Sequence, residues 1–150
     1  MKVNFTANEE LAPDDIEVTV SASQITTDVM NLMQQIQNLT LPSTNLPITL
    51  EDRVVFLPIN EIILLEVFGT EIVIQTIEKS YTTKGQLKKF YARLPQKVFV
   101  QISKNSLINI EHLTYLEAGF SGNMTAFLTN ENRASVSRKY LPKLKQILGL

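Results

Sequence analysis

Apolar and polar residues alternate along two short segments at the start of the chain. Residues 1–7 show this alternation, and residues 16–20 repeat it. A period of two is typical of strands with one buried face, so two strands are predicted here. The intervening Pro13-Asp14-Asp15 predicts a turn between them.

A helical spacing follows the second of these segments. Apolar side chains recur every three or four positions over Thr26–Leu39, which predicts an amphipathic helix. These side chains are Val29, Leu32, Met33, Ile36 and Leu39. Residues Thr40–Pro47 are rich in Pro, Ser and Asn and predict a linker. We therefore divide the chain into a β-β-α appendage, residues 1–45, and a larger domain, residues 46–150.

The larger domain consists mainly of short apolar segments separated by turn residues, which predict strands. The predicted strands are Ile48–Leu50, Val54–Leu57, Ile62–Phe68, Ile72–Ile77, Tyr81-Thr82, Val98–Ile102, Leu107–Ile110, Leu113–Leu116, Met124–Leu128 and Arg133–Val136. The expected fold class is therefore mainly β.

One short helix interrupts these strands. Four apolar side chains fall on a single helical face; they are Leu87, Phe90, Tyr91 and Leu94. Thr83 and Gln86 predict a capping box at the start of this helix, and Pro95 ends it. Residues Pro142–Leu148 predict one or two further helical turns.

Charge is distributed unevenly, although the formal net charge is only -1. Residues 1–78 hold twelve acids and two bases, whereas residues 79–150 hold twelve bases and three acids, which gives -10 and +9. A basic half is typical of proteins that bind polyanions. The alternative is that the two halves fold against each other and neutralise.

The chain lacks the residues that many catalytic and metal sites require. It has no cysteine and one histidine, His112, which lies between predicted strands, where a surface turn residue is favoured over a catalytic base. Its five glycines form no phosphate-binding loop. No enzymatic activity, cofactor, metal or small-molecule substrate is expected. Without a signal sequence or a membrane-length apolar run, a cytoplasmic protein is expected.

Three loops contain residue types that contact nucleic acid. They are the corner Ser103–Ser106, the segment Ser135–Tyr140 after the last strand, and the turn Phe68–Glu71. Lysine, arginine, asparagine and serine side chains bond phosphates and base edges. In the third loop, the carboxylate of Glu71 would repel phosphate. For each loop, the alternative is an ordinary solvated turn or tail.

Four segments, in this order and spacing, resemble the LytTR family of bacterial DNA-binding domains. They are Ile62–Glu66 with Gly69-Thr70, Gly85–Phe90, Phe99–Asn109, and Val136-Ser137-Arg138-Lys139-Tyr140. The resemblance covers about Leu46 to Leu150. It implies an elongated, antiparallel β fold whose loops, rather than a recognition helix, enter successive major grooves of double-stranded DNA.

The resemblance also implies roles for individual side chains. Lys104 would face a base edge, with Ser103 and Asn105 beside it on the DNA backbone. Arg138 and Lys139 would form a second contact, and the turn at 69–71 a third. The DNA-contacting residues expected on this basis are Lys104, Arg138, Lys139, Ser103, Asn105, Ser137, Thr70 and Glu71.

The chain departs from the family pattern at three places. Ser103 stands where the family usually has histidine, Gln101 where it usually has arginine, and Glu71 lies in the first loop. Each change removes positive charge or a donor, so the first loop is the weakest expected contact. Four core residues are also expected, Phe99, Ile102, Leu107 and Ile108, and Asn109 is expected to bond backbone rather than DNA.

The first 45 residues lie outside the resemblance and are too few for a receiver domain, so a stand-alone regulator is expected. The apolar stripe of the predicted helix favours either a homodimer or inhibitor surface, or packing on its own β domain. The resemblance implies a small membrane protein as a restraining partner. Deleting residues 1–45 and measuring the mass in solution tests the dimer, which an unchanged oligomeric state would exclude.

The leading hypothesis is a sequence-specific transcription regulator that binds double-stranded DNA. One alternative is a protein-interaction module whose basic face binds an acidic partner. Another is a binder of single-stranded nucleic acid, a class that relies on aromatic stacking. Only 7% of the residues are aromatic, and most of them occupy predicted core positions.

Overall fold

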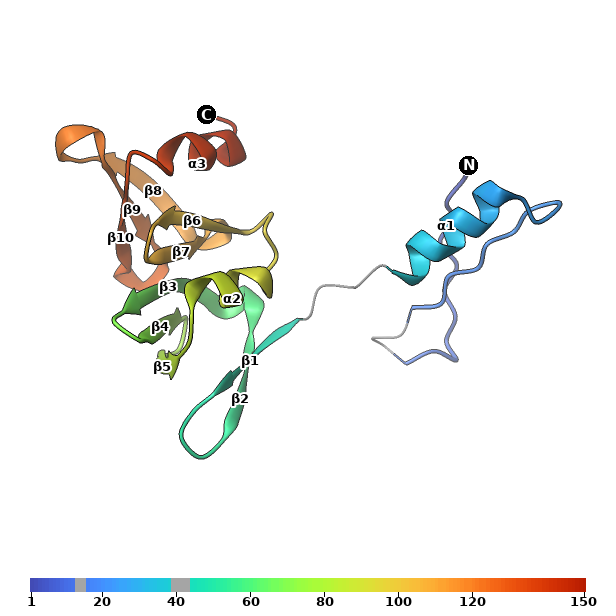
Figure 1. Cartoon of the computed structure of the whole chain (residues 1–150), viewed down its shortest axis with the longest axis horizontal. Coiled ribbons are helices and arrows are strands. Elements are labelled where there is room, and N and C mark those ends of the chain that lie inside the picture. The colour runs from blue at the N-terminus through green and yellow to red at the C-terminus, as the bar shows by residue number, and fades with distance from the viewer. Residues whose placement is uncertain (13–15, 39–43) are drawn as a thin grey trace. The chain divides into compact units, whose positions relative to one another are not determined.

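The computed structural model describes residues 1–12, 16–38 and 44–150 (Figure 1). The chain divides into two compact units, Met1–Leu41 and Pro42–Leu150, which are described separately here. The predicted turn at 13–15 and the predicted linker over residues 40–43 lie outside the described residues.

The first unit contains one helix in its described part, α1 (Thr27–Gln37). The hydroxyl of Thr26 caps this helix by accepting a hydrogen bond from the backbone N–H of Val29 at 3.3 Å. Residues 1–7 and 16–20 form no strand, which corrects the prediction of two strands there. A two-stranded ribbon with no layer to cover it is marginally stable in water, and the side chains of both segments stay exposed, Phe5 at 92%.

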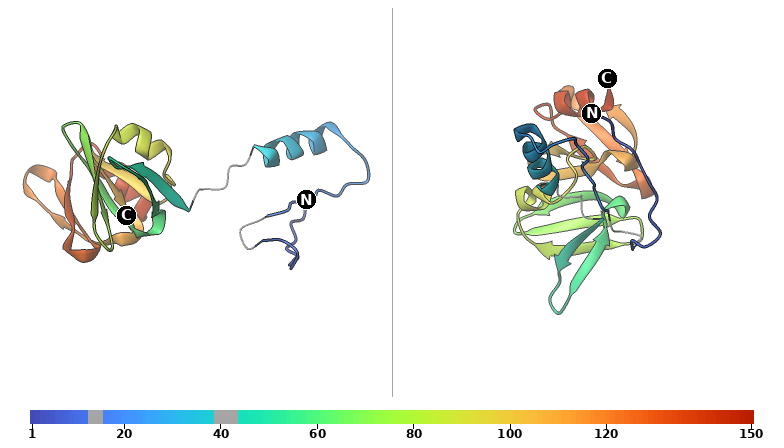
Figure 2. Two further views of the ribbon diagram at one scale, coloured as in Figure 1. Left: turned by 90° about the horizontal axis from the view of Figure 1, so that it is seen from below. Right: turned by 90° about the vertical axis from the view of Figure 1, so that its right-hand side faces the viewer.

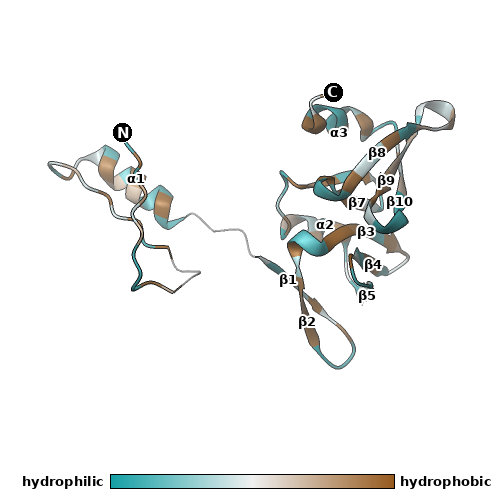
Figure 3. Ribbon diagram, turned by 180° about the vertical axis from the view of Figure 1, so that it is seen from behind, coloured by the Kyte–Doolittle hydropathy of each residue, from teal (hydrophilic) through white to brown (hydrophobic). Residues whose placement is uncertain are grey.

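The second unit is built on an antiparallel sheet of five strands in the order β5-β4-β3-β7-β6. The strands are β3 (Ile62–Phe68), β4 (Glu71–Thr76), β5 (Ser80–Lys84), β6 (Phe99–Ser103) and β7 (Ser106–Asn109). The central strand β3 is apolar over Ile62–Leu65, seen as brown ribbon in Figure 3, because the sheet is buried on both faces.

Two smaller sheets and two helices complete this unit. The sheets are β1–β2 (Asn45–Thr49, Val54–Pro58) and, in the order β10-β9-β8, β8 (Leu113–Ala118), β9 (Met124–Leu128) and β10 (Arg133–Val136). The helices are α2 (Leu87–Ala92) and α3 (Leu141–Leu148). Single 3₁₀ turns occur at Ile59–Glu61, Ile110–His112, Phe120–Gly122 and Thr129–Glu131.

Each face of the five-stranded sheet has its own hydrophobic core. On one face, the hairpin β1–β2 and helix α2 contribute Leu46, Leu57 and Phe90. On the other face, the three-stranded sheet and α3 contribute Val136 and Leu144, and the two views of Figure 2 show these layers. The mainly β, antiparallel fold is therefore confirmed. The four predicted core residues, Phe99, Ile102, Leu107 and Ile108, are all 0% exposed.

Two local expectations differ from the structure. Thr83 does not cap α2, because it is paired in β5 and its hydroxyl donates to the carbonyl oxygen of Thr49 at 2.7 Å. The helix begins after Gln86 without a side-chain cap. Residues 45–47 belong to β1 rather than to a linker. The helical turns predicted over Pro142–Leu148 are confirmed as α3, in which Pro142 fits the first turn because its N–H is not needed there.

Two polar side chains connect loops at the start of β3 to neighbouring elements. Asn109, fully buried, donates to the carbonyl oxygen of Ile62 at 2.9 Å and accepts from the backbone N–H of Glu111 at 2.9 Å, as expected. The ring nitrogens of His112 lie 3.1 Å from Thr129 Oγ1 and 2.7 Å from the carbonyl oxygen of Asn60. His112 therefore joins two loops in a half-buried position rather than occupying an open surface turn.

Candidate nucleic-acid interface

The corner between β6 and β7 presents Lys104 and Asn105 at its exposed tip. Its backbone is fixed by hydrogen bonds from the N–H of Asn105 to Ser103 Oγ at 3.2 Å and from the N–H of Val67 to the carbonyl oxygen of Asn105 at 2.8 Å. A bulge between Gln101 and Ser103 precedes the corner. Because the backbone is held from both sides, the two exposed side chains project from a defined position.

The turn between β3 and β4 lies beside this corner. Phe68, Gly69, Thr70 and Glu71 are exposed, and Gly69 adopts φ +63°, a left-handed conformation that favours glycine. Glu71 lies directly opposite Lys84 in the pairing of β4 with β5. This neighbouring cation lowers the repulsion that Glu71 would exert on a phosphate.

The segment after β10 lies on the other side of the corner. The N–H of Ser137 donates to the carbonyl oxygen of Ile102 at 2.9 Å, which places this segment beside the end of β6. The side chain of Arg138 packs along Gly122, where an added Cβ would lie 3.0 Å from Arg138 Cδ. Lys139 Nζ lies 5.7 Å from the centre of the Tyr140 ring. Both Arg138 and Lys139 remain exposed.

These contacts bring the three loops together along one end of the five-stranded sheet (Figure 1). In spatial order, the loops are 137–139, 103–105 and 69–71, and we refer to this set of residues as the loop edge. Every candidate DNA-contacting residue predicted from the sequence lies on it. Loops far apart in the sequence therefore carry Arg138, Lys139 and Lys104 at the same end of the sheet.

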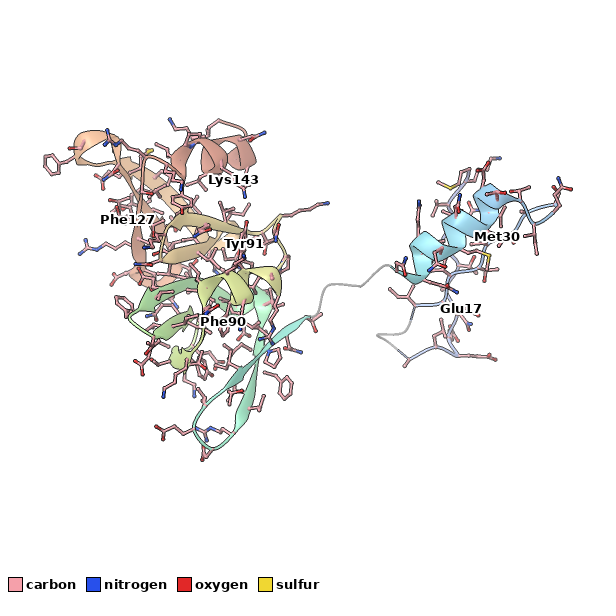
Figure 4. All side chains as sticks on the ribbon, in the orientation of Figure 1. Glu17, Met30, Phe90, Tyr91, Phe127 and Lys143 are labelled. Atoms are coloured by element: carbon pink, nitrogen blue, oxygen red, sulfur yellow. The ribbon has the colours of Figure 1, made fainter. Side chains whose placement is uncertain are left out.

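The charges on the loop edge are not neutralised by ion pairs. Across the described ranges, the one ion pair within 4 Å joins Arg53 to Asp52, in the turn between β1 and β2. Lys143, near the loop edge in sequence, is directed instead to α2, where its Nζ donates to the Tyr91 hydroxyl at 3.4 Å (Figure 4). Arg138, Lys139 and Lys104 are therefore free to meet an anion.

A half-buried carboxylate, Glu66, lies under the corner and was not among the predicted site residues. Glu66 is paired with Ser106 across β3 and β7, and the Ser106 side chain hydrogen-bonds to it. Burial raises the pKa of Glu66 above 4.5, and the bond to Ser106 partly opposes this rise. The sequence shows this acid only as the polar end of an apolar strand.

A contact made by the loop between β8 and β9 is a second feature that sequence reasoning missed. Phe120 in this loop is 95% exposed, and Ser121 and Gly122 adopt positive φ. The loop lies against the stem of Arg138. The Gly119–Gly122 spacing signals a turn but not this contact.

Comparison with known proteins identifies the domain. Residues 52–149 match the family model described as the LytTr DNA-binding domain. This chain belongs to that family. Within it, the chain is 34% identical over 105 residues to the sensory transduction protein LytR of Staphylococcus epidermidis, covering 70% of this chain and 42% of that protein. It is 30% identical over 105 residues to LytR of Streptococcus agalactiae, covering 70% and 43%. The chain thus spans less than half the length of these curated relatives.

A solved structure shows the same fold. The LytTr DNA-binding domain of a Bacillus cereus response regulator superposes with a TM-score of 0.65 at 19% identity, covering 72% of this chain and 99% of that one. The resemblance to the LytTr family that the four sequence segments indicated is therefore confirmed. No helix within the described ranges is long and apolar enough to cross a membrane.

Proposed function

We propose that this chain is a sequence-specific transcription regulator that binds double-stranded DNA through the loop edge. The observation that carries this proposal is the alignment of three loops, each with exposed polar or basic side chains, along one end of a LytTr-family sheet. Successive loops along one end of the sheet suit successive major grooves of a duplex. In the major groove, each base pair presents its own pattern of hydrogen-bond donors and acceptors.

Phosphate contacts would supply most of the affinity. Exposed cations at 138, 139 and 104 have no acidic partner within 4 Å, so they are available to displace counterions from the duplex. Contacts of this kind position the protein but carry no sequence information. Binding should therefore weaken steeply with rising salt.

Specificity would come from Lys104 and Arg138. Lys104 is at the tip of a corner whose backbone is hydrogen-bonded to β3, so its side chain extends from a fixed backbone position. Its ammonium group would then face the edge of a nucleotide base. Arg138 has a planar fork that can bond guanine or phosphate through two N–H groups. Ser103, Asn105 and Ser137 would then bond the backbone beside them.

The turn at 69–71 would make the weakest contact. Thr70 can donate a hydrogen bond through its hydroxyl, whereas Glu71 carries a charge that phosphate repels. The opposing Lys84 partly offsets this repulsion. A homodimer on DNA stays a prediction that rests on the apolar stripe of the first helix, and a small membrane protein as a restraining partner stays one that rests on the family resemblance.

The test begins with selection of a duplex from random sequences, followed by titration against a scrambled duplex over a series of salt concentrations. Lys104→Ala and Arg138→Ala should each cost about 1–3 kcal/mol on the selected duplex, with less loss on the scrambled one. Lys97→Ala is the matched control, because exposed Lys97 precedes β6 and so lies at the opposite end of that strand from the loop edge.

Two results would contradict this function. Equal binding by Lys104→Ala, Arg138→Ala and the native chain would remove both residues from the interface. Failure of the selection to enrich any sequence would favour the alternative, a protein-interaction module whose basic face binds an acidic partner.

A further inference from the structure

A cleft between β1 and the start of α2 adjoins the loop edge. It is lined by backbone and side chains of Pro47, Ile48, Thr49, Thr83, Lys84, Gly85, Gln86, Lys89, Phe90 and Arg93. Three of these residues are cationic and none is acidic. None of the three cations belongs to an ion pair within 4 Å, as judged over the described part of the chain. Such an unneutralised lining calls for an anionic occupant.

The position of the cleft continues the series of loops. The N–H of Gly85 approaches the carbonyl oxygen of Thr70 at 3.5 Å, which sets the end of β5 beside the turn at 69–71. The spatial order along this end of the sheet is therefore 137–139, 103–105, 69–71 and then 84–86. An extended polyanion lying along the first three loops would reach the mouth of the cleft next.

The shape of the cleft is fixed by packing rather than by flexible side chains alone. Arg93 donates from Nη2 to the carbonyl oxygen of Pro47 at 3.0 Å, and its guanidinium lies 5.9 Å from the centre of the Phe90 ring. This leaves the other N–H groups of its fork available. Gly85 allows the close approach of Phe90, because an added Cβ would lie 2.7 Å from Cε2 of that ring.

The distribution of charge has a cost that a bound anion would offset. Lys89 and Arg93 are four residues apart at the end of the short helix α2, a spacing at which like charges repel. Glu71 lies opposite Lys84 in the pairing of β4 with β5. Lys89 and Arg93 have no acidic neighbour among the lining residues of the cleft.

We infer that this cleft binds phosphate groups, and that their source is the DNA backbone flanking the site read by the loop edge. Arg93 would supply the fork, and Lys89 and Lys84 would each supply a point charge. The inference rests on the proposed DNA-binding function and extends the contacted duplex beyond the turn at 69–71, on one side only.

The experiment uses the full chain and the selected duplex, trimmed to the base pairs that the selection enriched. That duplex is then extended by about ten base pairs, roughly one helical turn, at one end or at the other. Extension at one end should tighten binding by the native chain, and extension at the other should not. Lys89→Gln should abolish this gain while leaving affinity for the trimmed duplex unchanged, and should lower the salt slope on the extended duplex by roughly one.

Two further variants keep the result interpretable. Arg93→Lys keeps the charge but loses the fork, so it should retain only part of the gain, and its circular dichroism reports whether α2 stays folded. Lys97→Gln removes an exposed cation at the far end of β6 and should behave as the native chain does. Equal gains by Lys89→Gln and the native chain would overturn the inference.

The same measurements distinguish failure of this inference from failure of the proposed function. If Lys104→Ala weakens binding to the trimmed duplex but extension has no effect on the native chain, the loop edge stands and the cleft contact fails. If neither the trimmed nor the extended duplex is bound specifically, both fail. Inorganic tripolyphosphate serves as a phosphate probe that is not part of DNA. If it shifts the NMR resonances of the Arg93 side chain while duplex extension has no effect, the cleft binds a small phosphorylated ligand, and DNA as the source of the phosphate groups is overturned.

Discussion

The two units of this chain show the same sequence pattern with different structural outcomes. Strand β4 alternates apolar and polar residues, and its inward side chains Ile72 and Ile74 are 0% exposed. Residues 1–7 alternate in the same way, yet Val3 and Phe5 are 88% and 92% exposed, and no strand forms. Alternation marks which side chains could share a face. A second layer of structure decides whether that face is buried and the strand is formed.

The largest expected difference between the units comes from removing one phenylalanine ring in each. Phe99→Ala should lower the free energy of unfolding by about 3–5 kcal/mol, because the ring is 0% exposed and its loss leaves a cavity in the core. Phe5→Ala should change it by less than about 0.5 kcal/mol, because that ring contacts mainly solvent. Urea denaturation of both variants measures the difference.

A large loss of stability in Phe5→Ala would contradict this comparison. It would mean that the first unit buries Phe5 in solution and that the alternating segment has a partner layer. Phe56→Ala is a control within the second unit, since this ring on β2 is 66% exposed and should behave like Phe5.

The same comparison can be made with one asparagine from each unit. Asn109 and Asn8 both accept a hydrogen bond through Oδ1 from the backbone N–H two residues later, at 2.9 and 3.1 Å. Asn109→Ala should cost about 1–3 kcal/mol, because it also leaves the buried carbonyl oxygen of Ile62 without its donor. Asn8→Ala should cost less than about 0.5 kcal/mol, since water replaces the bond at an exposed site.

Thermal unfolding followed by circular dichroism would measure both asparagine variants. Asn109→Asp is the informative companion, because it keeps the acceptor for Glu111 but removes the donor for Ile62. If Asn109→Asp matched the native chain in stability, the donated bond would contribute nothing and the expected cost would be wrong.

The sequence predicted most strands of the second unit because their partners are local. Ile62–Phe68, Met124–Leu128 and Arg133–Val136 have the bounds that were predicted, and each pairs with a neighbour in the chain. The capping box at Thr83 failed for a non-local reason. Its hydroxyl bonds Thr49, 34 residues earlier, and no spacing within the helix signal reveals that competitor.

The candidate site shows the same limit. Composition and family resemblance indicated Lys104 and Arg138, because their loops carry recognisable residue types. That these loops adjoin one another follows from backbone bonds between distant segments, such as Ser137 to Ile102 and Val67 to Asn105. The lining of the cleft is equally non-local, since it joins residues 47–49 to residues 83–93. Contacts between such distant segments produce no periodic pattern in a single sequence.

The smallest expected effect concerns a carboxylate in each unit, Glu66 in the sheet and the exposed Glu17. Burial raises the pKa of Glu66 above its value of 4.5 in an unfolded chain, so the folded protein binds a proton more readily than the unfolded one. The stability that this group contributes is therefore fully present below pH 4.5 and is lost as pH rises through the folded pKa. Glu66→Gln should gain stability relative to the native chain as pH increases across that window.

The size of this gain should be small, because Glu66 is only half-buried and solvent screens its charge. Urea denaturation at several pH values from 4 to 7 would measure it, with Glu17→Gln controlling for loss of one negative charge. Glu66→Ala separates charge from hydrogen bonding, since it removes the acceptor for Ser106 that glutamine retains. If the difference in stability between the native chain and Glu66→Gln stayed constant with pH, the raised pKa of Glu66 would be contradicted. If the difference in stability from the native chain grew with pH for Glu66→Gln but not for Glu17→Gln, an ionised carboxylate would cost stability at position 66 in the sheet and not at position 17 in the first unit.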